Sequence, residues 1–250
     1  MNNSFFSRIP PVTKNLIIIN FIVWLAMFAL PKHLGANLED LLGLHYFKSP
    51  DFNPVQLFTY MFLHSRYDLA HIFFNMFTLF MLGGLLERTL GAGRFLFYYL
   101  SCGIGAALIQ EAVWAMTWES SFVSLIASQN VGVSTEEIEM WMTSPQGAQI
   151  ASAYLSKFLT IGASGAIYGV LLAFGVMFPN MPMYLMFIPI PIKAKWMVIG
   201  MGIIELLIGL SQAAGANDGV AHFAHLGGMI FGLLILLYWK KKGLLDGLGY

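Results

Sequence analysis

The stretch GASGAIYG, residues 162–169, places Ser164 between glycines at the start of an apolar run that continues to Phe178. Gly162 and Gly165 allow the backbone to turn tightly into a helix and to expose the serine hydroxyl. A second apolar run carries His225 near its start. Serine becomes a good nucleophile once a base removes its proton, and histidine titrates in the range that this role needs. Two such residues at matched depth in apolar segments predict a nucleophile and its base inside a membrane.

The composition indicates which solvent surrounds the chain. Of 250 residues, 58% are hydrophobic and 10% are charged, whereas a soluble domain carries about 25% charged residues. We therefore expect an integral membrane protein that is embedded in a lipid bilayer. The formal net charge of zero argues against a nucleic-acid partner. The single cysteine, Cys102, excludes an intrachain disulfide and a metal cluster built from cysteines.

Six segments are apolar and long enough to be membrane helices, each of which needs about 20 residues. They predict an all-α polytopic membrane protein with six transmembrane helices. Arg8 and Lys14 precede the first segment, but no small-residue cleavage site follows it, so we expect this segment to remain as an anchor. The expected helices cover about 15–30, 69–86, 95–116, 161–178, 196–212 and 220–239.

The distribution of lysine and arginine predicts the orientation, because cytoplasmic segments of membrane proteins are enriched in both. An inside amino terminus leaves few basic residues outside, namely Lys32, Lys48, Arg66 and Lys157. The remaining ones then lie inside: Arg8, Lys14, Arg88, Arg94, Lys193, Lys195 and Lys240 to Lys242. We therefore expect both termini in the cytoplasm, in a cell (plasma) membrane.

Two outer connections are too long to be simple turns. Residues 31–68 combine the acidic pair Glu39-Asp40 with apolar stretches, which is typical of a segment lying in the membrane interface. Residues 117–160 contain glutamates interleaved with apolar residues near 136–142, which predicts a short amphipathic helix at the headgroup level. Because we find no internal repeat, we expect a single membrane domain over residues 1–250 that contains both outer segments.

Polar side chains from three of the expected helices fall at one depth. In the predicted orientation His71, Asn75, Ser164 and His225 all lie in the outer part of the bilayer, where polar groups are costly unless they face a cavity or one another. His71 and Asn75 are four residues apart and share one helix face. Both can donate hydrogen bonds, as an oxyanion hole requires. Tyr168 lies one turn after Ser164, where it can pack on the base.

Small residues recur at a spacing of four in the helices that carry the serine and the histidine. Gly165 and Gly169 form one such pair, and Gly228 and Gly232 form the other. This spacing lets two membrane helices approach closely. A hydrogen bond between Ser164 and His225 requires such an approach.

Together these motifs resemble the rhomboid family of intramembrane serine proteases, in its compact six-span prokaryotic form. The resemblance covers about residues 52–232 with the motifs in order. The matching stretches are HIFFN at 71–75, GGLLERTLG at 83–91, GASG at 162–165 with Tyr168, and AHLGGMIFG at 224–232.

The resemblance implies a role for each matched residue. Ser164 would be the nucleophile and His225 the general base, as a dyad with no third acid. The Ser164 amide, His71 and Asn75 would stabilise the oxyanion, and Tyr168 would stack on His225. The resemblance also implies single-pass transmembrane substrates, a rhomboid-like helix bundle, a site that opens toward the outer side, and no cofactor or metal.

Some positions depart from the family pattern. Val55-Gln56 stand where many members have Trp-Arg, so the arginine's structural role in the first outer loop is missing or is taken by another residue. The outer segment 117–160 is longer than in the basic form, and we expect it to pack on the surface. We expect His222 to be structural rather than the base. Glu205 is an intramembrane acid with no evident partner, although such acids are usually functional.

Three other functions are less compatible with the sequence. A non-cleaving relative that only binds membrane segments would be expected to lack Ser164 or His225. A small transporter or proton pathway could use the histidines and Glu205, but it would place polar groups at several depths and commonly shows an inverted repeat. A zinc protease would carry a His-Glu-X-X-His motif, which is absent. We therefore expect a serine endopeptidase that works within the membrane.

Overall fold

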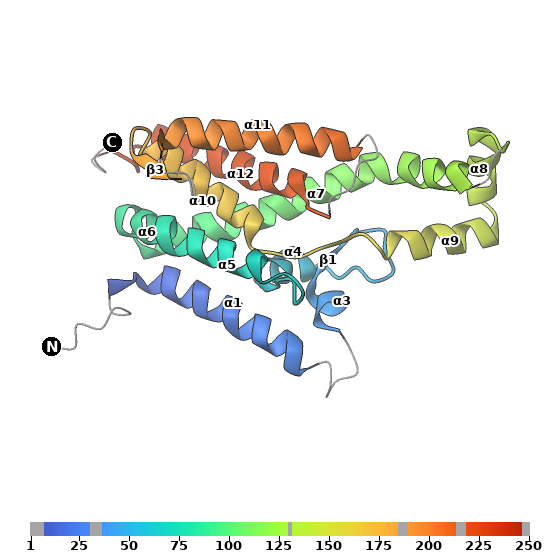
Figure 1. Cartoon of the computed structure of the whole chain (residues 1–250), viewed down its shortest axis with the longest axis horizontal. Helices are drawn as coiled ribbons and strands as arrows, with labels where there is room; N and C mark the ends of the chain where they lie inside the picture. Colours follow the sequence, from blue (N-terminus) through green and yellow to red (C-terminus); the bar gives the residue numbers. More distant parts are fainter. Residues whose placement is uncertain (1–7, 31–36, 130–131, 185–189, 214–218, 247–250) are drawn as a thin grey trace.

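The structure is a computed structural model that describes residues 8–30, 37–129, 132–184, 190–213 and 219–246. It confirms a helical polytopic membrane bundle (Figure 1). The helices in the described part that are long and apolar enough to span a membrane are α1 (Pro11–Ala29), the continuous helix α5–η3–α6 (Leu69–Leu90), α7 (Ala92–Gln129), α11 (Ala194–Ala213) and α12 (His222–Lys241). One further apolar helix, α10 (Ser164–Met177), is shorter than these.

Helix α10 is too short to cross the hydrocarbon layer completely. At 14 residues it is about 21 Å long, compared with a hydrocarbon layer of about 30 Å. A helix of this length that reaches one membrane surface ends well inside the opposite one. Ser164 is the first residue of this short helix.

The expected end of the third helix was wrong. Instead of stopping near residue 116, α7 continues to Gln129, and its 38 residues make it about 57 Å long. Figure 1 shows its far end projecting beyond the rest of the bundle, with α8 (Thr135–Met142) and α9 (Pro145–Leu155) beside it. The helix continues because its outer part is packed against α9 and the first outer loop. This contact forms a hydrophobic core separate from that of the bundle, with the buried side chains Tyr46, Trp118, Phe122, Ala151 and Leu155.

The amphipathic helix expected in the outer segment corresponds to α8. It begins with a capping box in which the Ser134 hydroxyl accepts from the Glu137 amide at 3.2 Å and the Glu137 carboxylate accepts from the Ser134 amide at 2.8 Å. Ile138 is its buried side chain, whereas Met140 is exposed. The helix α9, which follows it and packs on α7, was not predicted.

The first outer loop is organised around Gln56, which is 1% exposed. The loop contains α3 (Leu38–Leu42), β1 (Leu44–His45), α4 (Gln56–Thr59) and the 3-10 turn η2 (Tyr60–Phe62). The Gln56 amide oxygen accepts from the backbone amides of His45 and Asn53, and its nitrogen donates to the carbonyls of Leu41 and Asp51. Gln56 thus uses both its donors and both its acceptor positions. A neutral amide therefore holds this loop together, at the position where the resemblance led us to expect arginine.

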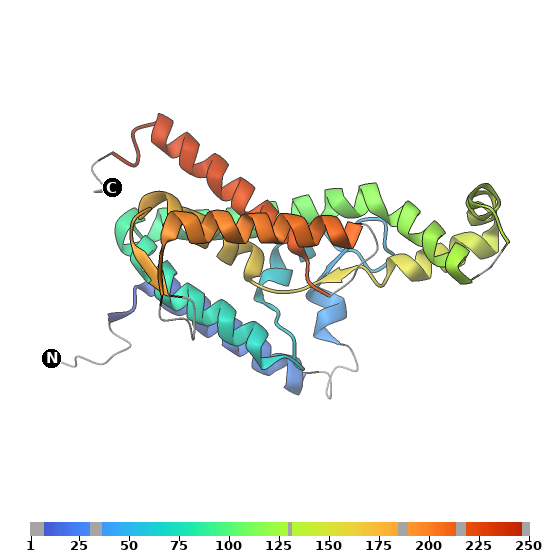
Figure 2. The ribbon, with the colours of Figure 1, turned by 45° about the horizontal axis from the view of Figure 1, so that its top comes forward.

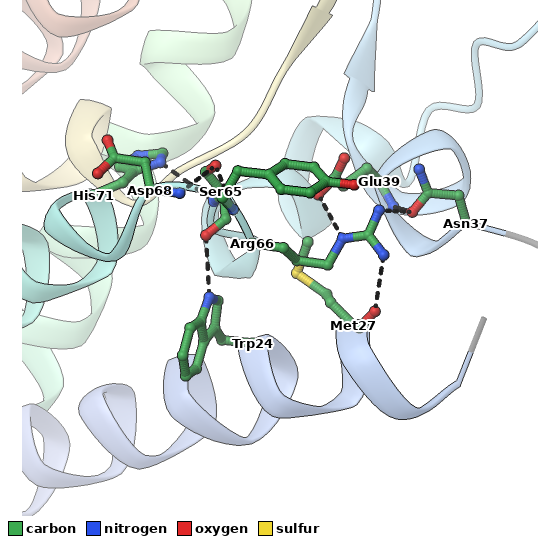
Figure 3. Close-up of polar contacts among 9 residues, drawn as sticks. Trp24, Met27, Asn37, Glu39, Ser65, Arg66, Asp68 and His71 are labelled. Carbon is green, nitrogen blue, oxygen red and sulfur yellow. Dashed lines mark hydrogen bonds and ion pairs between the residues drawn. The ribbon is translucent and has the colours of Figure 1, made fainter. Parts of the chain in front are cut away.

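Arg66 connects the same loop to α1 (Figure 3). Its guanidinium donates to the Glu39 carboxylate at 3.2 Å, to the Asn37 side chain at 3.2 Å and to the Met27 carbonyl at 3.3 Å. Met27 lies in the last turn of α1, where unpaired carbonyls favour a cation. The charge of Arg66 therefore fixes the end of α1 to α3.

Two pairs of very short antiparallel strands accompany the helices and were not predicted. β1 pairs with β2 (Leu159–Thr160), and β3 (Pro182–Tyr184) pairs with β4 (Pro191–Lys193). The first pair attaches the chain immediately before the GASG motif to the first outer loop. The Gly162 amide adds a hydrogen bond to the Tyr60 carbonyl at 3.0 Å. The approach to Ser164 is thereby held at several consecutive residues.

Helix α1 lies along the outside of the α5–η3–α6 helix (Figure 1), in which η3 (Leu79–Gly83) is a π-helical turn. The amino-terminal end of α1 is capped by Glu87, a residue that is 3% exposed. The Glu87 carboxylate accepts from the amides of Val12 and Thr13 at 2.9 and 2.7 Å and from the Thr13 hydroxyl at 2.8 Å. A carboxylate at this position satisfies unpaired N–H groups and complements the helix dipole.

Helices α7, α10 and α12 form the centre of the bundle, and α11 lies against α10 and α12 (Figure 2). The close approach of α10 and α12 that the glycines predicted is present. A side chain at Gly228 would meet the Gly165 carbonyl at 1.8 Å, and one at Gly169 would meet the Gly228 carbonyl at 3.1 Å. Gly232 instead faces α7, where a side chain would meet the Tyr98 hydroxyl at 2.3 Å. Its expected contact with α10 was therefore wrong.

Candidate active site

Ser164 and His225 meet at the interface of α10 and α12. The serine oxygen Oγ lies 2.8 Å from Nε2 of His225, within hydrogen-bond distance. Ser164 is the first residue of α10, and His225 lies in the first turn of α12. The glycine contacts between these helices bring the two backbones close enough for short side chains to touch.

Gly162 shapes the approach to Ser164. Its φ of +129° is one that residues with a side chain rarely adopt. A side-chain carbon at this position would also lie 2.6 Å from Nε2 of His71. The backbone conformation and the lack of space both require glycine here. Gly165 has a different role from the expected turn, because it lies within α10 and makes room for the side chain of Ala106.

The ring of Tyr168 lies parallel to the imidazole of His225. The ring centroids are 4.3 Å apart and the planes are inclined by 6°. Stacking of this kind restricts rotation of the imidazole about its side-chain bonds. The rest of its orientation is fixed by hydrogen bonds at both ring nitrogens.

His71 and Asn75 approach the serine from α5. Nδ1 of His71 accepts from the Ser65 amide at 3.4 Å, which leaves the ring proton on Nε2, the atom that faces Gly162. The Asn75 side chain donates one N–H to the His71 carbonyl at 2.8 Å and is 6% exposed. A donor on His71 is thus directed at the segment that precedes Ser164, with Asn75 one turn further along α5.

The loop before α5 determines where His71 lies (Figure 3). The Asp68 side chain caps α5 by accepting from the Ala70 amide at 2.9 Å, and the Ser65 hydroxyl accepts from the Asp68 amide at 3.1 Å. The Trp24 indole donates to the Ser65 carbonyl at 3.1 Å. His71 is therefore held by a chain of contacts that extends to α1.

His64 is a residue of this site that the sequence analysis missed. It is fully buried, and its ring meets that of His71 edge-on with centroids 5.0 Å apart. Burial and the neighbouring His71 lower the pKa of His64 to about 3. The available signal was its position at the end of the mostly apolar stretch LFTYMFL at 57–63, seven residues before His71.

The structure corrects the expectation that Glu205 has no evident partner. The expectation of a catalytic dyad with no third acid stays a prediction. Glu205 is 7% exposed, and its Oε2 lies 2.9 Å from Nδ1 of His225 and 2.6 Å from Nδ1 of His222. Its Oε1 accepts from the Tyr168 hydroxyl. A carboxylate therefore follows the histidine in the same order as in a serine–histidine–acid triad.

The same three residues could hold a metal ion. The ligand atoms of Glu205, His222 and His225 lie within 4.8 Å of one another and all three residues are buried. Two imidazoles and a carboxylate suit zinc. In the present geometry, however, both histidines direct Nδ1 at the carboxylate, so the cluster forms a hydrogen-bonded network. The sequence-based expectation of a metal-free site stays a prediction.

The site and the chain termini lie at opposite ends of the bundle. The Arg88 side chain donates to the Arg8 carbonyl at 2.6 Å, and the Arg94 side chain donates to the Leu244 carbonyl at 3.1 Å, so both terminal segments meet the corner between α6 and α7. Figure 1 shows the start of α1 and this corner at the same end. Ser164 begins α10 at the other end. The basic residues Arg88 and Arg94 thus lie at the same end of the bundle as the two terminal segments.

The sequence of the chain is similar to that of proteins in one known family. Residues 51–242 match the family model described as Rhomboid domain. The chain is 30% identical to Rhomboid protease AarA of Providencia stuartii over 70% of this chain and 52% of that relative. It is 26% identical to the mitochondrial Rhomboid protein 1 of Saccharomyces cerevisiae over 71% of this chain and 40% of that relative. The matches span about half the length of these relatives or less.

Proposed function

The chain belongs to the rhomboid family, and we propose that it is a serine endopeptidase that cleaves transmembrane substrates inside the lipid bilayer. The observation that carries this proposal is the 2.8 Å contact between Oγ of Ser164 and Nε2 of His225. The contact joins a hydroxyl to a base in a buried, largely apolar interface. A catalytic role also explains why polar side chains of α10, α11 and α12 lie together in this interface.

In the proposed reaction, Ser164 Oγ attacks the carbonyl carbon of the scissile peptide bond while its proton moves to Nε2 of His225. The resulting tetrahedral intermediate carries a negative oxygen. The Ser164 amide, which lies at the amino-terminal end of α10, and the Nε2 proton of His71 are placed to stabilise that oxygen. Asn75 is the further donor on the same face of α5.

The intermediate collapses when the peptide C–N bond breaks. His225 returns its proton to the leaving amine, and an ester between Ser164 and the remaining part of the substrate is left. Water then attacks this ester, again with His225 taking the proton. The second collapse releases a carboxylic acid and restores the Ser164 hydroxyl. No cofactor or metal is required by these steps.

The proposed orientation follows from charge and from the length of α10. With both termini in the cytoplasm, the site faces the outer side of a plasma membrane. Because α10 is about 21 Å long, Ser164 lies below the outer surface, at a depth to which water must descend. A substrate segment that can unwind there would present its peptide bond to the serine. We propose single-pass transmembrane proteins as the substrates, as the resemblance to the rhomboid family implies.

A transporter or proton pathway agrees less well with the described residues. His222, His225 and Glu205 form one cluster, and His71 lies against Gly162, two residues before Ser164. These groups gather in one place rather than along a path through the membrane. A non-cleaving relative would not need the contact between His225 and Ser164.

The test is cleavage of a labelled single-pass protein by the purified chain in liposomes. The comparison includes Ser164→Ala, His225→Ala and the matched control Ser128→Ala, whose hydroxyl bonds only its own helix in the exposed end of α7. We expect loss of cleavage and of fluorophosphonate labelling in Ser164→Ala, loss of cleavage in His225→Ala, and unchanged activity in the control. Cleavage that survives Ser164→Ala would exclude this nucleophile. A folded wild-type chain that neither cuts nor reacts with the probe would favour a binding protein.

A further inference from the structure

Glu205 joins side chains from two other helices to α11. Its Oε2 faces Nδ1 of His222 at 2.6 Å and Nδ1 of His225 at 2.9 Å, and its Oε1 accepts from the Tyr168 hydroxyl. The residues beside it on α11 point outward, since Ile204 is 56% and Leu207 is 62% exposed. Glu205 is 7% exposed and is thus the polar side chain that this helix directs into the bundle.

The geometry restricts where the protons lie. An ionised carboxylate can only accept hydrogen bonds, so each of its three partners must donate. The tyrosine donates its hydroxyl proton, and each histidine then carries its proton on Nδ1. This arrangement satisfies all three contacts at once, as a buried charge requires. It leaves Nε2 of His225 without a proton and directed at Oγ of Ser164, 2.8 Å away.

We infer that Glu205 is a positioning residue for His225, which makes the proposed dyad a serine–histidine–glutamate relay held across α10, α11 and α12. This inference rests on the proposed function. The carboxylate holds the imidazole in the tautomer that can accept the serine proton. Once the proton has moved, the same carboxylate lies beside the positive imidazolium and compensates its charge. In this role Glu205 acts through His225 alone: it does not contact the substrate and it takes up no proton.

Tyr168 and His222 hold the Glu205 carboxylate in place beside His225. Tyr168 stacks on His225 at 4.3 Å and reaches Oε1 with its hydroxyl, so a single side chain restrains both members of the pair. His222 precedes His225 by three residues and shares Oε2 with it. Glu205 therefore cannot turn away from His225 without losing two other hydrogen bonds.

The experiment measures kcat and KM separately for wild type, Glu205→Gln, Glu205→Asp and Leu207→Gln in the same liposomes. Glu205→Gln keeps size and shape but offers an N–H that can select the wrong tautomer. We expect kcat to fall about 10² to 10⁴-fold with little change in KM. Glu205→Asp restores the carboxylate and should recover part of this loss. Leu207→Gln places the same amide on the lipid side of α11 and should leave both constants within about twofold.

A second measurement needs only the wild-type chain. The protein has six histidines, so nitrogen-15 labelling of histidine gives few enough signals to assign the protonated nitrogen of each ring by magnetic resonance. We expect His225 and His222 to carry their protons on Nδ1. A neutral His225 protonated on Nε2 would overturn the inference whether or not the variants fold.

The remaining outcomes separate this inference from the proposed function. If wild type cleaves, Ser164→Ala does not, and Glu205→Gln retains kcat within about threefold, then the protease assignment stands and the relay is wrong. If EDTA abolishes cleavage and zinc restores it, then Glu205, His222 and His225 are metal ligands rather than a relay, and the inference also fails.

Discussion

Replacing Gly162 with alanine tests whether the site depends on the backbone just before the nucleophile. The substitution adds one methyl group, yet the structure predicts two separate penalties. The φ of +129° is unfavourable for alanine and costs about 1–3 kcal/mol. The added carbon would lie 2.6 Å from Nε2 of His71, whereas ordinary contacts begin at 3.4 Å, so the ring or the backbone must move by about 3.4 − 2.6 = 0.8 Å.

The substitution is also expected to slow catalysis by the folded variant. A misplacement of about 1 Å in a catalytic group costs about 100-fold in rate, or about 2.7 kcal/mol of transition-state stabilisation. We therefore expect kcat of Gly162→Ala to fall about 100-fold, because His71 no longer faces the developing oxyanion. The assay is cleavage of the labelled substrate in liposomes, together with thermal unfolding of the variant.

The matched control is Gly200→Ala in α11. A side chain at Gly200 meets nothing within 4 Å, and its φ is not positive, so the same methyl group should leave the rate unchanged. The reasoning fails if Gly162→Ala retains kcat within about threefold of wild type. It also fails if the rate loss is matched by Gly200→Ala, because the effect would then reflect glycine in general rather than the contact with His71.

Two other predictions concern stability. Glu87→Gln should lower the free energy of unfolding by about 1–3 kcal/mol, because the charge-assisted hydrogen bonds that cap α1 are weakened; thermal unfolding in detergent checks this, and an unchanged midpoint would contradict the capping role. The pKa of His64 in the folded chain, about 3, lies below its unfolded value of about 6.5, so the associated stability is full above pH 6.5 and falls as the pH decreases toward 3, by up to about 1.4 kcal/mol per unit. His64→Phe should remove this part of the acid sensitivity while keeping the ring contact with His71, and unfolding midpoints at pH 7 and pH 5 that shift equally in both proteins would refute it.

Local patterns in the sequence were sufficient to predict most of the helices. The apolar runs define membrane spans because the hydrocarbon layer fixes their length. The spacing of Gly165, Gly169 and Gly228 predicted the close approach of α10 and α12, since that contact depends on residues four apart on one face. The meeting of Ser164 and His225 then followed from matching the depths of two helices. Each of these inferences depended on the spacing of residues along one helix or on the thickness of the membrane.

Contacts between distant segments could not be predicted in this way. The third helix was expected to end near 116, where polar residues become more frequent, but α7 continues because Trp118 and Phe122 are buried against α9. Glu205 had no evident partner because its three donors are 17 to 37 residues away on other helices. The role of Gln56 was equally hidden, since its partners lie in irregular backbone of the first outer loop.

The requirements of a membrane interior and of catalysis coincide in this site. In the interior of a membrane, a polar side chain must find a partner within the protein or face a water-filled cavity. Ser164, His225 and Glu205 meet this condition through one connected series of hydrogen bonds, which Tyr168 and His222 complete. The same series places a base on the serine and a carboxylate on the base. In the proposed reaction, the Ser164 oxygen is therefore already arranged for attack. The carbonyl oxygen of the substrate must then bind to the hydrogen-bond donors of α5 and of the start of α10.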